Sequence, residues 1–257
     1  MTTKTYRRML EWAAGAGAAL ALSSAALAET APVLNIYSTG VAQNAARVMQ
    51  LNYAKAVRNG WENGPNFTQT GGTDARVVGL LKDGAAADIV IVQTSEMAGL
   101  EKAGLVRPGT VKPLGRVDIA VGVKAGAARP DISTYAKFRD ALLAAGTVAY
   151  TDPKSGSAGG KLIDSLLDKP EFANLKRVHN ARVATGEVPI WLEAAGQLRG
   201  AYGVDEVGLV PESLNAHLQF SIAVGANAKN PEAAIAFENY VLQRRFAPVW
   251  TKWGVAR

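Results

Sequence analysis

Three short segments that suit strands, each followed by a polar turn and then by a helical pattern, constrain the fold of this chain most. They lie at 33–37, 67–70 and 88–92, and the third, Asp-Ile-Val-Ile-Val, is almost entirely apolar. Continuous apolar strands are typical of a parallel sheet that helices cover on both faces. The order strand, turn, helix, repeated three times, predicts an α/β fold with a mainly parallel, doubly wound sheet.

The helical patterns that follow these segments have recognisable ends. Asn59-Gly60 is expected to end the first helix and Gly84 the second. Ser95 is expected to cap the start of the third helix, and Gly104 to end it. Serine accepts hydrogen bonds from the free N–H groups of a first turn, and glycine adopts the backbone conformation that closes a last turn.

A second set of strands and helices begins near residue 116. Apolar residues, alternating or continuous, predict strands at 117–123, 147–150, 207–210 and 218–224. Four helices are expected: one capped by Ser133 and ending at Gly146, one over 162–167, one over 186–198, and one from Asn230-Pro231-Glu232 to about residue 245.

The first 28 residues resemble a secretory signal peptide. Lys4, Arg7 and Arg8 form a positive start, residues 13–27 are mostly apolar, and Ala26-Leu27-Ala28 is a small-x-small cleavage pattern. The apolar run is shorter than the ~20 residues that cross a bilayer. We therefore expect residues 1–28 to be removed and residues 29–257 to be soluble in the periplasm. No cysteine follows the cleavage pattern, so no lipid anchor is expected.

Composition excludes several classes of function. The chain has no cysteine and only two histidines, His179 and His217, so thiol catalysis and Cys- or His-rich metal centres are excluded. Residues 1–28 carry three basic and one acidic residue, so removing them lowers the net charge from +6 to +4. These charges are scattered, which argues against nucleic acid as a partner and leaves a small anion as a compatible ligand. We expect no metal and no cofactor.

Four blocks of sequence resemble a known family. They are residues 88–106, Tyr150-Thr-Asp-Pro153 with its Gly/Ser/Ala turn, residues 226–237, and Trp253-Gly-Val255. In this order they are similar to the blocks of periplasmic substrate-binding proteins of the molybdate-binding type. The resemblance spans about residues 33–255.

The resemblance implies a type II periplasmic binding protein fold. Two doubly wound α/β lobes are then joined by a hinge that the chain crosses twice. Lobe one would comprise 29–114 plus 212–257, and lobe two 115–211. The resemblance also implies a monomer that holds one small anionic ligand in the cleft and delivers it to a membrane ABC permease.

Three donor-rich turns, at 38–40, 71–73 and 155–159, are the candidate binding site, because they lie at strand ends, where α/β folds bind ligands. Free N–H groups at helix starts attract anions, hydroxyls add donors, and small residues allow close approach. Each turn could equally be an ordinary helix cap. The candidate ligand-binding residues are Ser38, Thr39, Gly72, Thr73, Ser157, Ala158 and Gly159, with Arg76, Gln197 and Tyr202 as further candidates.

Two functions remain open from the sequence. The first is binding without chemistry, of a molybdate-type oxyanion or a small organic acid; Asp74 would bring a carboxylate close to such an anion unless it points away. The alternative is a periplasmic, aconitate-isomerase-like enzyme that shifts a proton in a di- or tricarboxylic acid. Such an enzyme needs a general base, and no sequence pattern singles out one acid for this role. The candidates near the predicted cleft are Asp74, Asp152, Glu187 and Glu193.

Overall fold

The first three strands pair in parallel, as the sequence predicts. In the computed structural model, which describes residues 31–57 and 65–257, β1 (Val33–Thr39) lies between β2 (Asn66–Gly72) and β3 (Ile89–Gln93). Leu34 and Ile36 of β1 are fully buried, which places the apolar face of the strand in the core. The predicted signal peptide and the helix end at 59–60 lie outside the described residues.

Each of these strands leads into a helix. The helices are α2 (Gly40–Val57), α3 (Asp74–Lys82) and α4 (Thr94–Lys102). The prediction that Ser95 caps α4 was wrong: Gln93, the last residue of β3, occupies the cap position without a side-chain hydrogen bond. The chain passes from strand to helix with no intervening turn, so no capping serine precedes the first helical residue.

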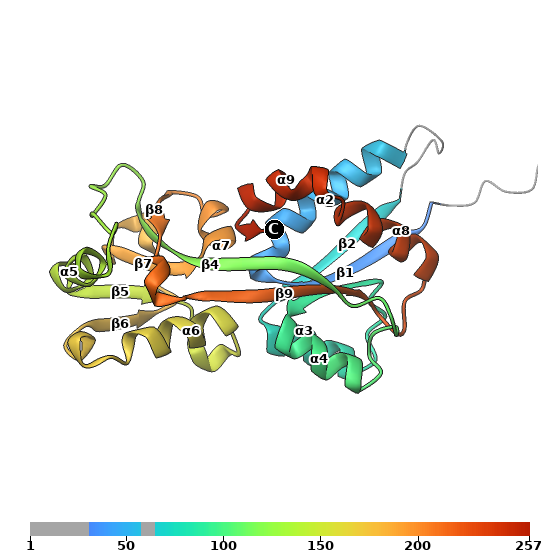
Figure 1. The fold of residues 1–257 in the computed structure, drawn as a ribbon, viewed down its shortest axis with the longest axis horizontal. Coiled ribbons are helices and arrows are strands. Elements are labelled where there is room, and N and C mark those ends of the chain that lie inside the picture. Colours follow the sequence, from blue (N-terminus) through green and yellow to red (C-terminus); the bar gives the residue numbers. More distant parts are fainter. Residues whose placement is uncertain (1–30, 58–64) are drawn as a thin grey trace, which may run out of the picture. The chain divides into compact units, whose positions relative to one another are not determined.

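Two long antiparallel strands run through the middle of the sheet. β4 (Lys112–Lys124) pairs with β9 (His217–Val224) over its first half, as Figure 1 shows. Its second half pairs with β7 (Ile190–Ala194) and β8 (Val204–Leu209). β9 also pairs with β3, and β10 (Val255–Ala256) pairs with β4. The sheet is therefore mixed: parallel strands on either side are joined by antiparallel pairs at its centre.

A second group of parallel strands lies beyond β4. β5 (Thr147–Tyr150) lies between β6 (Lys176–His179) and β7 (Ile190–Ala194), and β8 (Val204–Leu209) pairs with β4. The order of strands along the main path is β2-β1-β3-β9-β4-β7-β5-β6.

The helices of this second group are α5 (Tyr135–Ala145), α6 (Ala158–Leu167) and the short α7 (Ala195–Arg199). Gly146 ends α5 in the left-handed conformation, as predicted, but the cap is Thr134, whose hydroxyl accepts the Lys137 N–H. Short 3-10 helices lie in the connections and near the C-terminus: η1 (Pro153–Ser155), η2 (Pro170–Phe172), η3 (Val183–Thr185), η4 (Glu212–Leu214) and η5 (Arg244–Phe246).

The helix predicted over 186–198 was wrong, because the middle of this segment, Ile190–Ala194, is a strand. Val188, Ile190, Leu192 and Ala194 alternate along it and are all buried. This period of two suits a strand inserted between β4 and β5, and only α7 at the end is helical.

The C-terminal helix is shorter than predicted. α8 begins after Asn230, as expected, but covers only Pro231–Val241 and is followed by η5 and α9 (Ala247–Lys252). The indole of Trp250, on α9, donates to the Val241 carbonyl at 2.9 Å. This bond satisfies one of the free carbonyls that a helix end exposes.

Two hydrophobic clusters form the main core. The larger lies among β1, β3 and β9 with α2 and α8, and includes Met49, Phe237 and Trp250. The second lies among β5, β7, α5 and α6, and includes Phe138 and Tyr150. Two clusters suit a chain with two lobes, although residues Pro32–Arg257 form one compact unit. The lobe boundaries at 114/115 and 211/212 stay a prediction.

One buried carboxylate ties three distant parts of the chain together. Asp88 is fully buried; its Oδ2 accepts the backbone N–H of Asn35 at 2.8 Å and the side-chain amide of Asn35 at 3.1 Å. Its Oδ1 accepts the backbone N–H of Asn230, at the start of α8, at 2.8 Å. The carboxylate therefore fixes α8 against β1 and β3.

Replacing Asp88 should destabilise the whole unit. Asp88→Ala leaves three donors without their acceptor, so we expect the free energy of unfolding to fall by about 3 kcal/mol. Asp83→Ala is the matched control, because Asp83 is exposed, and it should change stability by less than about 0.5 kcal/mol. Urea unfolding followed by circular dichroism measures both. Equal, small effects of the two changes would contradict the role given to Asp88.

Candidate functional site

A cavity of about 310 Å³ lies where the ends of β1, β2 and β5 meet the helices that follow them. Most of its walls are small or polar residues, and both predicted lobes contribute to it. The lining residues are Thr39, Gly40, Val41, Gln43, Gly72, Thr73, Asp74, Thr151, Ser157, Ala158, Gly159, Gln197 and Phe220.

The structure brings together seven of the ten residues that the sequence proposed for a site. All three predicted turns contribute, together with one residue of α7. The seven are Thr39, Gly72, Thr73, Ser157, Ala158, Gly159 and Gln197.

The other three candidates, Ser38, Arg76 and Tyr202, lie outside the cavity lining. Successive residues of a strand point to opposite faces, so Ser38 points away from the face of Thr39, and its Oγ receives a weak contact from the Gln69 amide at 3.4 Å. Arg76 lies against Gly72 instead, since a Cβ added to Gly72 would lie 2.5 Å from the Cδ of Arg76. Tyr202, in the turn after α7, is 98% exposed.

Three helices begin at the cavity: α2, whose Gly40, Val41 and Gln43 line it, together with α3 and α6. Thr73 caps α3, accepting the Arg76 N–H at 3.3 Å, and Ser157 caps α6, accepting the Gly160 N–H at 3.1 Å. Both residues are thus helix caps and cavity residues at once. Because each hydroxyl oxygen accepts the cap bond, each hydroxyl proton stays available for another acceptor.

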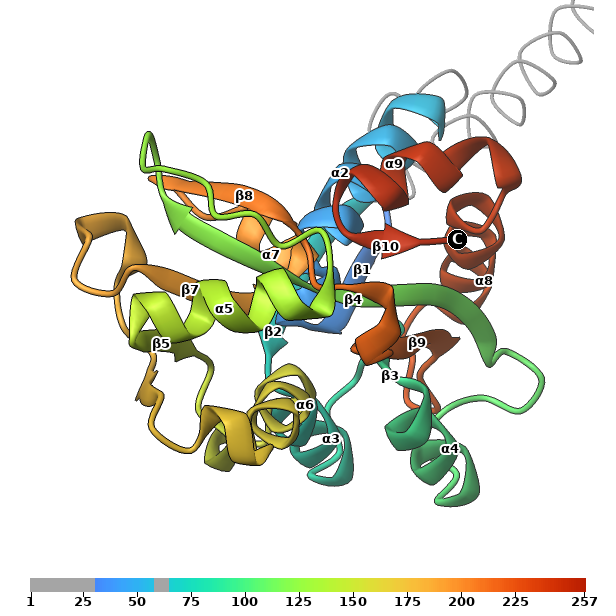
Figure 2. The same ribbon diagram turned by 60° about the vertical axis from the view of Figure 1, so that its left-hand side comes forward.

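The ends of α3 and α6 lie side by side, as Figures 1 and 2 both show. Gly156, just before α6, has a φ of +82°, and a Cβ placed on it would lie 2.5 Å from the Cβ of Ala75. Glycine is required here both by its backbone conformation and by this close approach. The two positive helix ends therefore act on one small volume.

A buried hydroxyl in the cavity wall has no hydrogen-bond partner. Thr39 is 2% exposed and lines the cavity, and its Oγ1 meets no partner within residues 31–57 and 65–257. An unsatisfied buried hydroxyl costs about 1–3 kcal/mol. The orphaned group thus marks a position at which a ligand atom would restore a hydrogen bond.

Asp74 lines the cavity with a carboxyl group. It is 6% exposed, and its Oδ1 accepts the Gln93 N–H at 2.9 Å. Burial raises the pKa of the Asp74 carboxyl, although backbone N–H groups of Gln93 and Ala158 oppose the rise. Asp74 is therefore a lining residue whose carboxyl is held by backbone donors.

A second carboxyl, Glu193, lies beneath the cavity floor. It is 1% exposed; Oε1 accepts the Ala194 N–H at 2.8 Å and Oε2 accepts the Thr151 hydroxyl at 2.5 Å. Burial raises the pKa of this carboxyl above its ordinary value of 4.5. The parallel register of β5 and β7, which pairs Ala149 with Trp191, places Thr151 opposite Glu193 two residues further on.

The other two acids that the sequence offered as bases are placed elsewhere. Asp152 caps η1 by accepting the Lys154 N–H at 2.9 Å, and Glu187 is exposed. Neither lines the cavity. Of the four acids, Asp74 lines the cavity, and Glu193 is hydrogen-bonded to the lining residue Thr151.

Charge at the site comes from dipoles and carboxyls. The described lining contains no lysine or arginine. Within residues 31–57 and 65–257, no cluster of three or more His, Asp or Glu side chains is arranged to hold a metal ion. Over the same residues, no helix has the length and apolar character needed to span a bilayer.

Sequence reasoning missed several lining residues, among them Gln43, Thr151 and Phe220. Gln43 lies one helical turn after Thr39, so the spacing could have indicated it. Thr151 directly follows β5, at the same edge of the sheet as the predicted turns. Phe220 comes from the antiparallel strand β9, and no local signal connects it with the turns.

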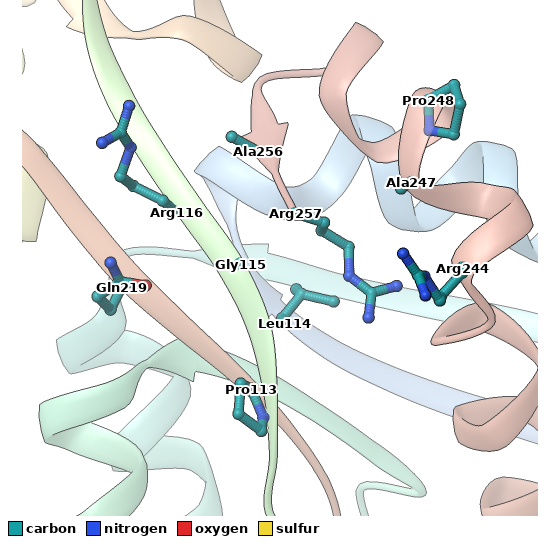
Figure 3. Close-up of a pocket in the computed structure, with 10 residues that line it drawn as sticks. All are labelled: Pro113, Leu114, Gly115, Arg116, Gln219, Arg244, Ala247, Pro248, Ala256 and Arg257. Atoms are coloured by element: carbon teal, nitrogen blue, oxygen red, sulfur yellow. The ribbon is translucent and has the colours of Figure 1, made fainter.

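A larger cavity, of about 710 Å³, is lined by none of the residues of the predicted turns. Figure 3 shows its lining residues. The cavity lies between β4, β9 and the C-terminal segment, and three arginines line it: Arg116, Arg244 and Arg257. Arg116 is paired with Asp118 at 2.9 Å and with Glu212 at 3.1 Å. None of the predicted site residues belongs to this cavity.

Comparison with known proteins identifies the class. The bacterial extracellular solute-binding protein family matches residues 34–256, and the chain therefore belongs to this family. An aconitate isomerase from Pseudomonas sp. is 30% identical over 236 residues, which cover 88% of this chain and 89% of that protein.

Solved structures show the same fold. The substrate-binding domain of a putative molybdenum ABC transporter from Clostridium difficile is 18% identical with a TM-score of 0.66, covering 88% of this chain and 99% of that one. The periplasmic molybdate-binding protein of Azotobacter vinelandii is 13% identical with a TM-score of 0.68, covering 87% and 99%. The fold is that of type II periplasmic binding proteins, as the sequence predicts.

The buried Glu193 should make stability depend on pH. Because its pKa is raised in the folded state, its contribution is fully present below pH 4.5 and is lost as pH rises through the folded pKa. We expect Glu193→Gln to become progressively more stable relative to the wild type as pH rises above 4.5. The exposed Glu187→Gln is the matched control and should track the wild type. Melting temperatures at pH 4 to 9 test this, and parallel curves for the wild type and Glu193→Gln would contradict it.

Proposed function

We propose that this chain is a periplasmic solute-binding protein that captures a small anion in the cavity of Thr39 and delivers it to a membrane ABC permease. The observation that carries the proposal is the buried, unpartnered hydroxyl of Thr39 at the meeting point of two helix N-termini. A ligand oxygen at that point would accept the Thr39 proton.

Neutral donors can hold an anion at this site. The starts of α3 and α6 offer free N–H groups and a favourable dipole, and the hydroxyls of Thr73 and Ser157 have protons to donate. Such fixed dipoles stabilise charge without a cationic side chain, because they are already oriented before the ligand arrives.

The ligand would bridge the two predicted lobes. In the predicted division of the chain, Thr39 and Thr73 fall in lobe one, and Ser157 and Gln197 fall in lobe two. An anion that contacts both would stabilise the closed arrangement over an open one by its differential affinity for the two. A closed, loaded protein is the form that a permease would need to recognise.

The family and the fold support transport as the role. Two structures with this fold are described as a molybdate-binding protein and as a domain of a molybdenum ABC transporter. The signal-like residues 1–28 support export to the periplasm, with residues 29–257 acting there as a monomer.

Binding should be visible as a gain in stability. We expect at least one small anion, from a panel of molybdate, tungstate, sulfate, phosphate and small carboxylates, to raise the melting temperature of residues 29–257 at large excess. Thr39→Val should lower the affinity for that anion about tenfold, because it removes one hydrogen bond. Thr251→Val is the control, because Thr251 is exposed on α9 away from the cavity, and it should bind normally.

Calorimetry of the two variants completes the test. Binding that is about tenfold weaker in Thr39→Val and normal in Thr251→Val supports the assignment of the cavity. If no anion in the panel stabilises the wild type, the proposed function is wrong.

A second candidate function is isomerisation of a di- or tricarboxylic acid. The relative that is an aconitate isomerase favours it, together with two carboxyls of raised pKa at the cavity, Asp74 and Glu193. A carboxyl whose pKa is raised above its ordinary value keeps its proton to a higher pH, which suits it to exchanging a proton with a substrate. Asp74 is the group that lines the cavity, and Glu193 reaches it through Thr151.

Turnover separates this candidate from binding alone. If the protein is an isomerase, it should interconvert cis- and trans-aconitate, and Asp74→Asn should lower kcat by at least about a hundredfold. Proton NMR of each isomer incubated with the protein measures both species. Absence of turnover for an acid that binds would exclude this candidate and leave the binding function intact.

A further inference from the structure

We propose that the cavity selects anions that also carry an O–H group, and that Glu193 sets this preference by fixing the direction of the Thr151 hydroxyl. The inference rests on the proposed function and names its ligand class: hydroxylated or partly protonated organic acids, in preference to fully ionised tetrahedral oxyanions.

The first step concerns Thr151. Thr151 lines the cavity, and its hydroxyl donates its single proton to Oε2 of Glu193 at 2.5 Å. A threonine hydroxyl has one proton and two lone pairs. With the proton directed at Glu193, the group presents only lone pairs to the cavity and therefore needs a donor from the ligand.

The second step explains why the proton points that way. Oε1 of Glu193 accepts the Ala194 N–H at 2.8 Å, and a backbone N–H can only donate. Glu193 is 1% exposed, so water does not compete for Oε2. When Glu193 is ionised, its carboxylate holds the Thr151 proton through a charge-assisted bond, one of the stronger kinds of hydrogen bond.

The third step adds a second acceptor. Asp74 is also a lining residue; its Oδ1 accepts the Gln93 N–H at 2.9 Å, and the backbone N–H of Ala158 also acts on its carboxyl. No lysine or arginine of the described lining offsets it. A fully ionised oxyanion would face these acceptors without a proton between them, whereas a ligand O–H can donate to one of them.

The cavity thus has two chemically different sides. Thr39, Ser157 and the starts of α3 and α6 offer donors suited to an ionised carboxylate. Thr151 and Asp74 offer acceptors suited to a hydroxyl or a protonated carboxyl. A site built to pair with a ligand hydroxyl discriminates strongly against analogues that lack it, because its own polar groups are then left unpaired.

Matched pairs of acids test the preference directly. Malate differs from succinate, and citrate from propane-1,2,3-tricarboxylate, by one hydroxyl. We expect the wild type, by titration calorimetry at pH 7.5, to bind at least one hydroxylated member about tenfold more tightly than its partner, and more tightly than sulfate or molybdate.

Glu193→Gln should abolish or reverse the preference. The amide oxygen can keep the Ala194 N–H, so the amide N–H₂ faces Thr151 and donates to it. The Thr151 proton is then free to point into the cavity. We expect the hydroxylated acid to lose affinity and the acid without the hydroxyl, or sulfate, to gain it.

Three further variants separate this role from a structural one. Thr151→Val should remove the preference, and Thr151→Ser should restore it. Ser157→Ala removes a donor from the other side, so it should weaken both members of a pair alike and leave their ratio unchanged. Melting temperatures confirm that each variant is folded.

The outcomes are distinguishable. A preference in the wild type that Glu193→Gln and Thr151→Val remove, and Thr151→Ser and Ser157→Ala preserve, supports the inference. Equal binding of both members of each pair, tighter binding of sulfate or molybdate, or a preference that survives Glu193→Gln overturns it while the proposed function stands. Binding of no anion at all overturns the proposed function itself.

Discussion

The antiparallel pairing of β4 with β9 is the constraint on which the rest of the structure depends. These two strands lie between the parallel group of β1, β2 and β3 and the parallel group of β5, β6 and β7. Each group directs the carboxyl ends of its strands at a helix start. The cavity exists because the central pair holds the two sets of helix starts against each other.

Electrostatics at the cavity combines two opposing elements. The starts of α3 and α6 favour negative charge, while Asp74 and Glu193 place acidic groups beside them. Neither carboxyl is neutralised by a cationic side chain of the described lining. Each instead accepts hydrogen bonds from backbone or hydroxyl donors. Such an arrangement recognises the pattern of donors and acceptors on a ligand as well as its charge.

The sequence predicts those parts of the site that rest on local signals. Thr39, Thr73 and Ser157 were identifiable because each stands between an apolar strand and a helical pattern. The α/β class and most strands followed from the same alternation. The lobe boundaries, the signal peptide and the roles of the site residues remain predictions.

The remaining features depend on contacts between distant segments. Residues 186–198 contain residues that suit a helix, and only the position between β4 and β5 selects the strand β7. The pairing of Thr151 with Glu193 follows from the register of β5 on β7, which no local pattern encodes. Tyr202 was placed near the site by its position in the sequence, but the turn after α7 directs it to solvent.

The position of β9 has a consequence for the order in which the chain can fold. β9 (His217–Val224) lies between β3 and β4, which precede it by about a hundred residues, and Asn230 supplies one of the donors to Asp88. During synthesis the central sheet therefore stays incomplete until residues beyond 217 have emerged. Loop closure over such separations is slow compared with helix formation. A chain built in this way cannot complete the sheet that joins β3 to β4 until late in its synthesis.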